Sequence, residues 1–298
     1  MKYRKAGKST LELSEIGFGC MSLRPGETQS IRVIHEALEK GINFFDTADL
    51  YDKGENERLV GKALTGKRKQ VILATKVGNQ WRADGTGCDW NPRKEYILKS
   101  IDKSLERLQT DYIDLYQLHG GTINDPIDET IEAFELLKQQ GKIRFYGISS
   151  IRPNVIDEYV RRSSIVTVMM QYGLLDRRPE ERCLQLLKDN GIGVLARGAL
   201  AKGLLVDKQE DQFLAYNKSD VKAAADAVKK VSVKGRTPAQ TAIQFVLNNE
   251  ALTSAVVGIR TLQQLQDVID VSESAPLHAD ELDVLRSAVD QNFYTERR

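Results

Sequence analysis

Cysteine, histidine and net charge are all scarce in this sequence of 298 residues. The three cysteines, Cys20, Cys88 and Cys183, lie far apart without a Cys-x-x-Cys pair, which argues against disulfides and against a thiolate metal site. The three histidines show no recognisable zinc spacing, so no metal site is expected. With 43 Lys and Arg against 42 Asp and Glu, the net charge of +1 gives no reason to expect nucleic acid or a membrane surface as a partner.

Long apolar runs are also missing. No stretch reaches the roughly 18 apolar residues that a membrane-spanning helix needs, and no apolar segment follows the basic N-terminus as it would in a signal peptide. The sequence therefore predicts a cytoplasmic protein. It contains no linker of low complexity and no composition shift, so residues 1–298 are expected to form a single domain.

Short apolar runs alternate with segments of helical periodicity along almost the whole chain. Residues 1–13 alternate around Gly7, as a short β-hairpin would. Eight strand-then-helix units follow. The strands are predicted at residues 16–19, 42–45, 71–76, 113–119, 143–149, 165–171, 193–196 and 254–257. The helices are predicted at 30–40 with Thr28 as cap, 55–64, 92–108, 127–140, 153–161, 179–190, 238–248 and 262–271. A loop is expected at 77–91, and extra helices are expected within 206–233 and at 279–293.

Eight alternating units over this length predict an α/β fold, namely a (β/α)8 TIM barrel with an N-terminal β-hairpin and extra helices. A doubly wound open sheet is the main alternative. The barrel is favoured because Asp46, Lys76 and His119 lie at the ends of three different strands, and barrel enzymes draw their catalytic groups from several strand ends at one face.

The residue types at these strand ends suit the reduction of a carbonyl group. Adding hydride to a carbonyl leaves an alkoxide that needs a proton, and a phenol can donate this proton when a nearby cation lowers its pKa. Tyr51 offers the phenol, Lys76 offers the cation, and Asp46 can hold that cation by pairing with it. His119 can orient the carbonyl oxygen through a hydrogen bond or help to relay the proton. The hydride must come from a nicotinamide, because no side chain carries one.

Taken in order, Asp46, Tyr51, Lys76 and His119 resemble the catalytic tetrad of the aldo-keto reductases. The resemblance covers essentially the whole chain, through Gly17-Phe18-Gly19, Gly147-Ile148-Ser149, Gln171-Tyr172 and Gly203-Leu204-Leu205. It implies an oxidoreductase that uses NADPH to reduce aldehydes or ketones to alcohols, with Tyr51 as the general acid and a small carbonyl compound as substrate.

The resemblance also implies where the cofactor NADPH lies, since the sequence has neither a Rossmann fingerprint nor a phosphate-binding loop. Ser149 and Gln171 match the positions that hold the nicotinamide carboxamide, and Arg197 replaces the aromatic residue that often stacks on the nicotinamide. Gly198, Leu200 and Gly203 match the loop that covers the pyrophosphate. Gly258, Arg260, Thr261 and Gln264 open a helix after the last strand and suit the 2′-phosphate. The family typically reads the adenine with an Asn, and Val268 stands at that position here. The neighbouring acid, Asp267, would then read the adenine.

Loops set specificity in barrel enzymes, and Met21, Trp81 and Trp90 are the candidates for the substrate pocket. The tail 292–298 is expected to dock over its own pocket or a neighbour's. One alternative function is a cofactor-binding, redox-sensing regulatory subunit with slow turnover. Another is a barrel glycosidase, which needs two opposed carboxylates where only Asp46, with Asp49 or Asp52, is available. The physiological substrate, the stereochemistry, the strength of the preference for NADPH over NADH and the oligomeric state, including a homo-oligomer, are left open.

Overall fold

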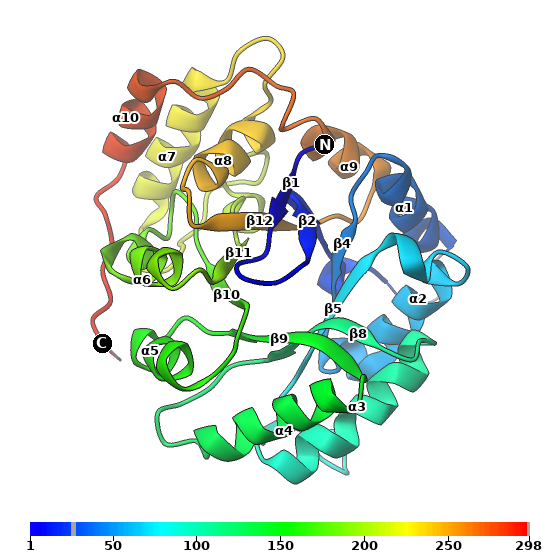
Figure 1. Ribbon diagram of the computed structural model, residues 1–298. Coiled ribbons are helices and arrows are strands. Elements are labelled where there is room, and N and C mark those ends of the chain that lie inside the picture. Colours follow the sequence, from blue (N-terminus) through cyan, green and yellow to red (C-terminus); the bar gives the residue numbers. More distant parts are fainter. Residues whose placement is uncertain (25–27, 297–298) are drawn as a thin grey trace.

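A computed structural model describes residues 1–24 and 28–296, and within these residues eight parallel strands close into a barrel (Figure 1). The order around the barrel is β10-β11-β12-β3-β4-β5-β8-β9. The strands are β3 (Ile16–Gly19), β4 (Phe44–Asp46), β5 (Ile72–Val77), β8 (Ile113–Leu118), β9 (Ile143–Ser149), β10 (Thr167–Gln171), β11 (Gly193–Arg197) and β12 (Leu252–Gly258). The expected (β/α)8 barrel is therefore confirmed, and the doubly wound open sheet is excluded because the sheet has no edge.

Helices surround the barrel on the outside (Figure 1). They are α1 (Thr28–Glu39), α2 (Glu55–Leu64), α3 (Lys94–Leu108), α4 (Ile127–Gln139), α5 (Pro153–Arg162), α6 (Cys183–Asp189), α7 (Lys218–Val231), α8 (Pro238–Leu247), α9 (Leu262–Ile269) and α10 (Ala279–Ser287). The helix α7 is the extra helix expected within 206–233. It begins at a capping box in which Asn217 accepts backbone N–H groups and Asp220 accepts the N–H of Asn217.

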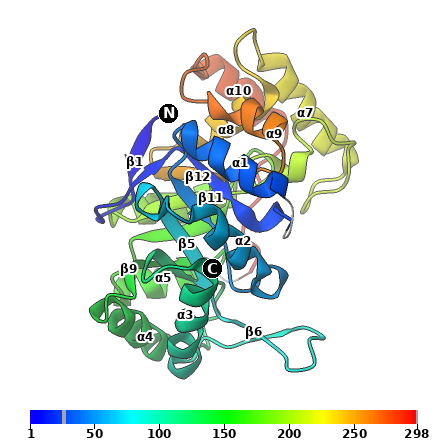
Figure 2. The ribbon, with the colours of Figure 1, turned by 90° about the vertical axis from the view of Figure 1, so that its right-hand side faces the viewer.

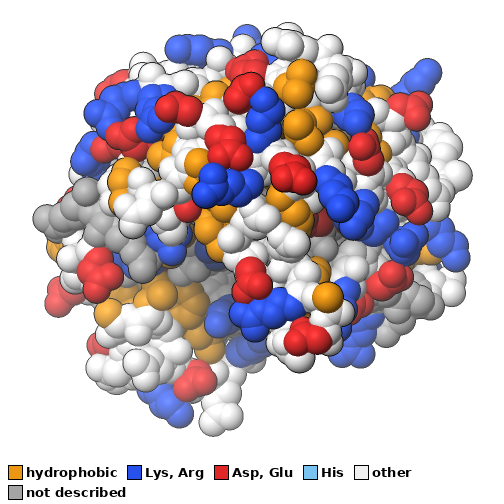
Figure 3. All heavy atoms as spheres, turned by 90° about the horizontal axis from the view of Figure 1, so that it is seen from below, with side chains coloured by type: hydrophobic (Ala, Val, Ile, Leu, Met, Phe, Trp, Pro, Cys, Tyr) orange, Lys and Arg blue, Asp and Glu red, His pale blue; other side chains and the backbone are white. Residues whose placement is uncertain are grey.

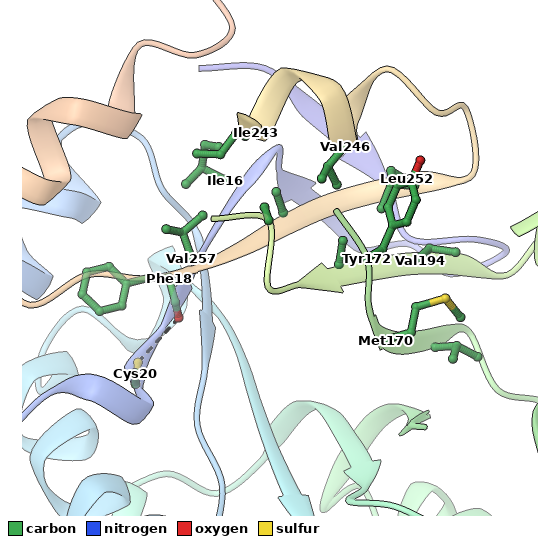
Figure 4. Close-up of a cluster of buried hydrophobic side chains, with 14 of the residues drawn as sticks. Ile16, Phe18, Cys20, Met170, Tyr172, Val194, Ile243, Val246, Leu252 and Val257 are labelled. Carbon is green, nitrogen blue, oxygen red and sulfur yellow. Dashed lines mark hydrogen bonds between the residues drawn. The ribbon is translucent and has the colours of Figure 1, made fainter. Parts of the chain in front are cut away.

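The apolar core has two parts. The larger part lies between the outer face of the barrel and the helices, where Ile243 and Val246 of α8 pack toward Ile16, Val257 and Leu252 of the strands (Figure 4). The smaller part fills the inside of the barrel with residues such as Phe44, Leu115 and Leu195. The N-terminal hairpin, made of β1 (Tyr3–Lys5) and β2 (Glu12–Ser14), lies over the barrel opening in Figure 1, and its Ala6, Leu11 and Leu13 belong to this inner cluster. The hairpin thus closes one end of the barrel and leaves the carboxyl ends of the strands to build a site.

Four sequence predictions differ from the structure. Thr28 is the first residue of α1 rather than its cap. The loop 77–91 contains an antiparallel ribbon of β6 (Asn79–Trp81) and β7 (Cys88–Trp90), which extends outward from the barrel (Figure 2). The predicted helix 179–190 is broken by the extended φ of −157° at Arg182, which separates a 3-10 turn, η4 (Arg178–Glu181), from α6. The last helix stops at Ser287 rather than 293, and the Arg177 guanidinium donates to the carbonyl oxygen of Arg286 in its last turn.

The surface carries both signs of charge in mixed order. Lys and Arg side chains alternate with Asp and Glu side chains over the face seen in Figure 3, as the balanced composition predicts. In the described part of the chain, no helix combines the length and the apolar character needed to cross a membrane. Nor do the described residues contain a cluster of three His, Cys, Asp or Glu side chains able to hold a metal ion.

Candidate active site

The four residues singled out from the sequence come together at the carboxyl end of the barrel. Asp46 is the last residue of β4, Lys76 lies near the end of β5, and His119 directly follows β8. Lys76 Nζ donates to Asp46 Oδ2 at 2.6 Å and lies 3.4 Å from the Tyr51 hydroxyl oxygen. The Tyr51 and His119 rings meet edge to face, with 5.7 Å between their centroids. Acid, ammonium, phenol and imidazole therefore form one contiguous group.

Lys76 is held as a buried cation. Its side chain is only 1% exposed, and Nζ also donates to the backbone oxygen of Thr47 at 2.7 Å. Burial alone would lower the pKa of Lys76, but the neighbouring Asp46 and Tyr51 outweigh burial and raise this pKa above its usual value. Burial raises the pKa of Asp46, while Lys76 and the side chain of Gln117 act in the opposite direction. The ammonium therefore keeps its charge next to the phenol oxygen.

One further residue supports this ion pair and was missed from the sequence. Gln117 of β8 is fully buried and donates from Nε2 to Asp46 Oδ1 at 3.2 Å, so both carboxylate oxygens of Asp46 are bound. Lys76 and Gln117 are paired neighbours in the β5 and β8 register. The available signal was a polar residue two positions before His119, because residues i and i+2 of a strand face the same side.

The loop that carries Tyr51 has an unusual backbone. Tyr51 opens a 3-10 turn, η2 (Tyr51–Gly54), in which Asp52 and Lys53 have φ of 48° and 54° and Gly54 has φ of 90°. Such positive φ values are costly for residues with a side chain and are often found at functional sites. The segment before it is tied to β5, since Asp49 N donates to Lys76 O at 3.3 Å and Thr47 N donates to Ala74 O at 2.9 Å. These bonds fix the phenol beside Lys76.

His119 is a neutral imidazole. Burial, Lys76 and Arg197 together lower the pKa of His119 to about 3. Its Nδ1 atom is buried and has no hydrogen-bond partner among the described residues. A neutral imidazole offers one N–H donor and one acceptor, so His119 can donate a hydrogen bond without carrying charge.

The two residues predicted to hold the nicotinamide carboxamide and the one predicted to stack on the nicotinamide ring lie on three neighbouring strands. Ser149 ends β9, Gln171 ends β10, and Arg197 ends β11. Arg197 Nη1 donates to Gln171 Oε1 at 2.9 Å, and Gln171 Nε2 donates to Asp176 Oδ2 at 2.9 Å. Arg197 therefore bonds directly to the side chain that would read the carboxamide. Asp176 is a second residue missed from the sequence, because it lies in a loop without a motif.

The next loop along the chain is built from left-handed backbone. Gly198 has φ of 86°, and a Cβ there would lie 3.1 Å from the Gln171 side chain. Leu200 packs against the core, while Ala201, Lys202 and Gly203 of η5 (Ala201–Gly203) have φ of 46°, 60° and 93°. This loop therefore lies close to the strand ends that carry Gln171 and Arg197. Because Gly198 has no side chain, the loop adds no bulk next to Gln171.

The segment after β12 forms a compact helix start. Thr261 caps α9 by accepting Gln264 N–H at 3.2 Å, and Gln264 Oε1 accepts the backbone N–H of Arg260 at 2.9 Å. Asp267 accepts a hydrogen bond from Gln263, and Val268 is buried in the core with 2% exposure. A Cβ at Gly258 would lie 3.2 Å from Ser22 Oγ, a buried hydroxyl without a partner in the described part of the chain.

The three residues predicted for the substrate pocket lie on two loops. Met21 belongs to η1 (Cys20–Ser22) and is 67% exposed. Trp81 and Trp90 belong to the β6–β7 ribbon, and the register places them on one face of it, diagonally across from each other. Trp90 packs against Gly120, the residue after His119, and its Nε1 donates to Asp125 at 3.0 Å. Trp81 instead lies beside Lys53, whose Nζ is 5.3 Å from the centre of the Trp81 ring.

A closed (β/α)8 barrel with titratable groups gathered at its carboxyl-terminal strand ends defines the class of barrel enzymes. A profile described as "Aldo/keto reductase family" matches residues 15–290. The chain therefore belongs to the aldo-keto reductase family, and it is an NAD(P)H-dependent oxidoreductase.

Relatives and solved structures agree with this assignment. The chain is 48% identical, over the full length of both proteins, to the uncharacterized oxidoreductase YqkF of Bacillus subtilis (strain 168). It is 32% identical to the L-galactose dehydrogenase of Arabidopsis thaliana, over 94% of this chain and 91% of that one. The holo form of aldo-keto reductase AKR11C1 from Bacillus halodurans superimposes with a TM-score of 0.94 and 48% identity, covering 100% of this chain and 99% of that one.

Proposed function

We propose that the protein uses NADPH to reduce aldehydes or ketones to alcohols, with Tyr51 as the general acid. The observation that carries this proposal is the position of Lys76 Nζ, 2.6 Å from an Asp46 carboxylate oxygen and 3.4 Å from the Tyr51 hydroxyl. The Tyr51 proton passes to the carbonyl oxygen as the substrate carbon is reduced, and the ammonium stabilises the phenolate that remains. Neutral His119 donates an N–H to the same carbonyl oxygen and orients it.

The residues present fit a nicotinamide dinucleotide. When bound, this cofactor supplies the hydride that no side chain can provide. Gln171 and Ser149 would bind its carboxamide. The buried Ser22 hydroxyl next to Gly258, which has no partner among the described residues, offers a further polar contact where the dinucleotide would cross the barrel. Arg260 is exposed at the start of α9, and we assign to it the 2′-phosphate that distinguishes NADPH from NADH.

The proposal includes a cytoplasmic location and a single domain over residues 1–298. All three cysteines are free, and Cys20 and Cys183 are buried, as expected for a protein of a reducing compartment.

The test follows the loss of nicotinamide absorbance with an activated aromatic aldehyde, with NADPH and NADH in parallel, for wild type and Tyr51→Phe. We expect oxidation that favours NADPH and a kcat roughly 10²–10⁴-fold lower in Tyr51→Phe, with cofactor affinity unchanged. Tyr112→Phe is the matched control, because Tyr112 precedes β8 and so lies at the other end of the barrel. Equal kcat in wild type and Tyr51→Phe would refute the role of the phenol. Tight NADPH binding without oxidation would favour a redox-sensing regulatory subunit.

A further inference from the structure

A cavity of about 220 Å³ lies between the Tyr51 loop, the β6–β7 ribbon and α3. It is smaller than the roughly 300–1,000 Å³ of pockets for drug-sized ligands, so it suits a small molecule. None of Asp46, Tyr51, Lys76 and His119 lines it. The lining residues are Asp49, Lys53, Asn79, Trp81, Tyr96 and, on one face of α3, Lys99, Lys103 and Arg107, together with Gln80 and Ser100.

Positive charge dominates the cavity wall. Lys99, Lys103 and Arg107 are spaced at i, i+4 and i+8, so they stand on one face of α3 at successive turns. Arg107 is neutralised by Glu57 at 2.5 Å, but within residues 1–24 and 28–296 neither Lys99 nor Lys103 makes an ion pair. Lys53 from the Tyr51 loop adds a third cation without a carboxylate partner in the same described residues. Like charges four residues apart destabilise a helix, and an anion between them would remove that cost.

Two buried polar atoms of the lining residues lie in the same region. Trp81 Nε1 and Asp49 Oδ1 are both buried and make no hydrogen bond with any described residue. Burial and the nearby Glu57 raise the pKa of Asp49 to about 8, while Arg107 and Lys76 act in the opposite direction. Asp49 is therefore mostly protonated at neutral pH, so it adds a hydroxyl donor rather than a negative charge that would repel an anion.

We propose that this cavity binds a small phosphomonoester, with the phosphoryl group held by Lys99, Lys103 and Lys53. Lysine ammonium groups are common point-charge partners of phosphate. Three such groups suit a ligand with two negative charges better than they suit a ligand with one carboxylate. The organic part lies against Trp81 and Tyr96. The site is separate from the residues assigned to NADPH, which follow β9 to β12 and, for Ser22, β3. The proposal does not rest on the proposed reaction.

The test is calorimetric titration of the full chain, without nicotinamide, with glycerol 3-phosphate, inorganic phosphate and glycerol. We expect saturable binding of glycerol 3-phosphate, weaker binding of inorganic phosphate and none of glycerol. The double variant Lys99→Gln/Lys103→Gln is expected to weaken binding of glycerol 3-phosphate at least tenfold. Lys229→Gln/Lys230→Gln on α7 removes the same charge from exposed positions of another helix and should leave the affinity unchanged.

Two results would overturn the proposal. The first is an absence of glycerol 3-phosphate binding, or an equal loss of affinity in both double variants. An equal loss would show that the affinity depends only on the overall charge of the protein. The second is loss of binding in Arg260→Gln, which would place the phosphate in the site assigned to the cofactor. A retained affinity in Arg260→Gln supports the separate site. Asp49→Asn provides a further check, because the uncharged amide should bind as tightly as wild type at pH 7 and more tightly than wild type at pH 9.

Discussion

Replacing Asp46 by Asn should destabilise the fold as well as stop the reaction. The Lys76 side chain is 1% exposed, and Asp46 Oδ2 at 2.6 Å is its only carboxylate partner within the described residues. Removing one member of a buried ion pair leaves the other charge without compensation and costs about 3–5 kcal/mol. The Thr47 carbonyl oxygen at 2.7 Å remains, but it carries no full charge. We therefore expect Asp46→Asn to lower the free energy of unfolding by about 3–5 kcal/mol.

The double variant Asp46→Asn/Lys76→Met separates stability from catalysis. Replacing both partners of a buried pair by neutral groups is often close to neutral, so the double variant should be more stable than Asp46→Asn alone, with a coupling energy of about 2–3 kcal/mol. Urea unfolding followed by circular dichroism measures the four free energies, and aldehyde reduction measures activity, which should stay lost.

The pH of this double-mutant cycle matters. The raised pKa of Lys76 gives a stabilisation that is fully present below the unfolded-state pKa of about 10.4 and is lost only as the pH rises through the higher folded pKa. Measurements at pH 7 therefore lie on the plateau. Additive losses, with the double variant less stable than either single variant, would refute the reasoning.

Four further predictions address the residues around this pair. Because the pKa of His119 is lowered to about 3, the pH profile of kcat should show no limb near pH 6.5, and a limb there that disappears in His119→Gln would contradict this. Arg260→Gln should weaken NADPH binding at least tenfold and leave NADH binding unchanged in a fluorescence titration. Burial raises the pKa of Asp49 to about 8, so the folded state holds this proton more tightly than the unfolded state does. The resulting stabilisation is full below the unfolded-state pKa and is lost as the pH rises through 8. Tm should therefore fall between pH 5 and 9 in wild type, and should fall less in Asp49→Asn. Cutting the chain after residue 292 removes the Tyr294 N–H donated to Glu181 at 3.1 Å and the ring 5.2 Å from Arg178, so Tm should fall by about 2–4 °C; an unchanged Tm would show that the tail adds no stability.

The barrel could be predicted from the sequence because each of its strands is a short apolar run followed by an amphipathic helix. Such local periodicity reports directly on burial. The β6–β7 ribbon was not predicted, since its strands pair with each other and each is only three residues long. The break at Arg182 and the early end of α10 were missed for a related reason. Both are changes of backbone conformation, such as the φ of −157° at Arg182, that leave no mark in the apolar periodicity.

The tetrad residues could be chosen from the sequence because each lies at or just after a predicted strand end. Their neighbours could not. Asp49 and Arg107 are separated by 58 positions in the sequence, yet both line one cavity. The tail 292–298 was expected to dock over the chain's own pocket or a neighbour's. In the structure, Tyr294 of this tail packs against η4 of the same chain. Residues 297–298 lie outside the described residues. Contacts of this kind arise only when loops from different strands converge at one end of a barrel.

The balance of charge at the strand ends gives the site a positive bias that the whole chain lacks. The whole chain contains 43 basic side chains and 42 acidic ones. At the mouth, Lys76 and Arg197 both act on His119 and both interact with Asp46, which is the one buried carboxylate among the four candidate catalytic residues. Two cations against one anion favour negative charge on an oxygen placed between them, which is the charge that develops when a carbonyl is reduced. We therefore propose that Arg197 contributes to the electrostatics of the reaction, through its effect on Asp46 and His119.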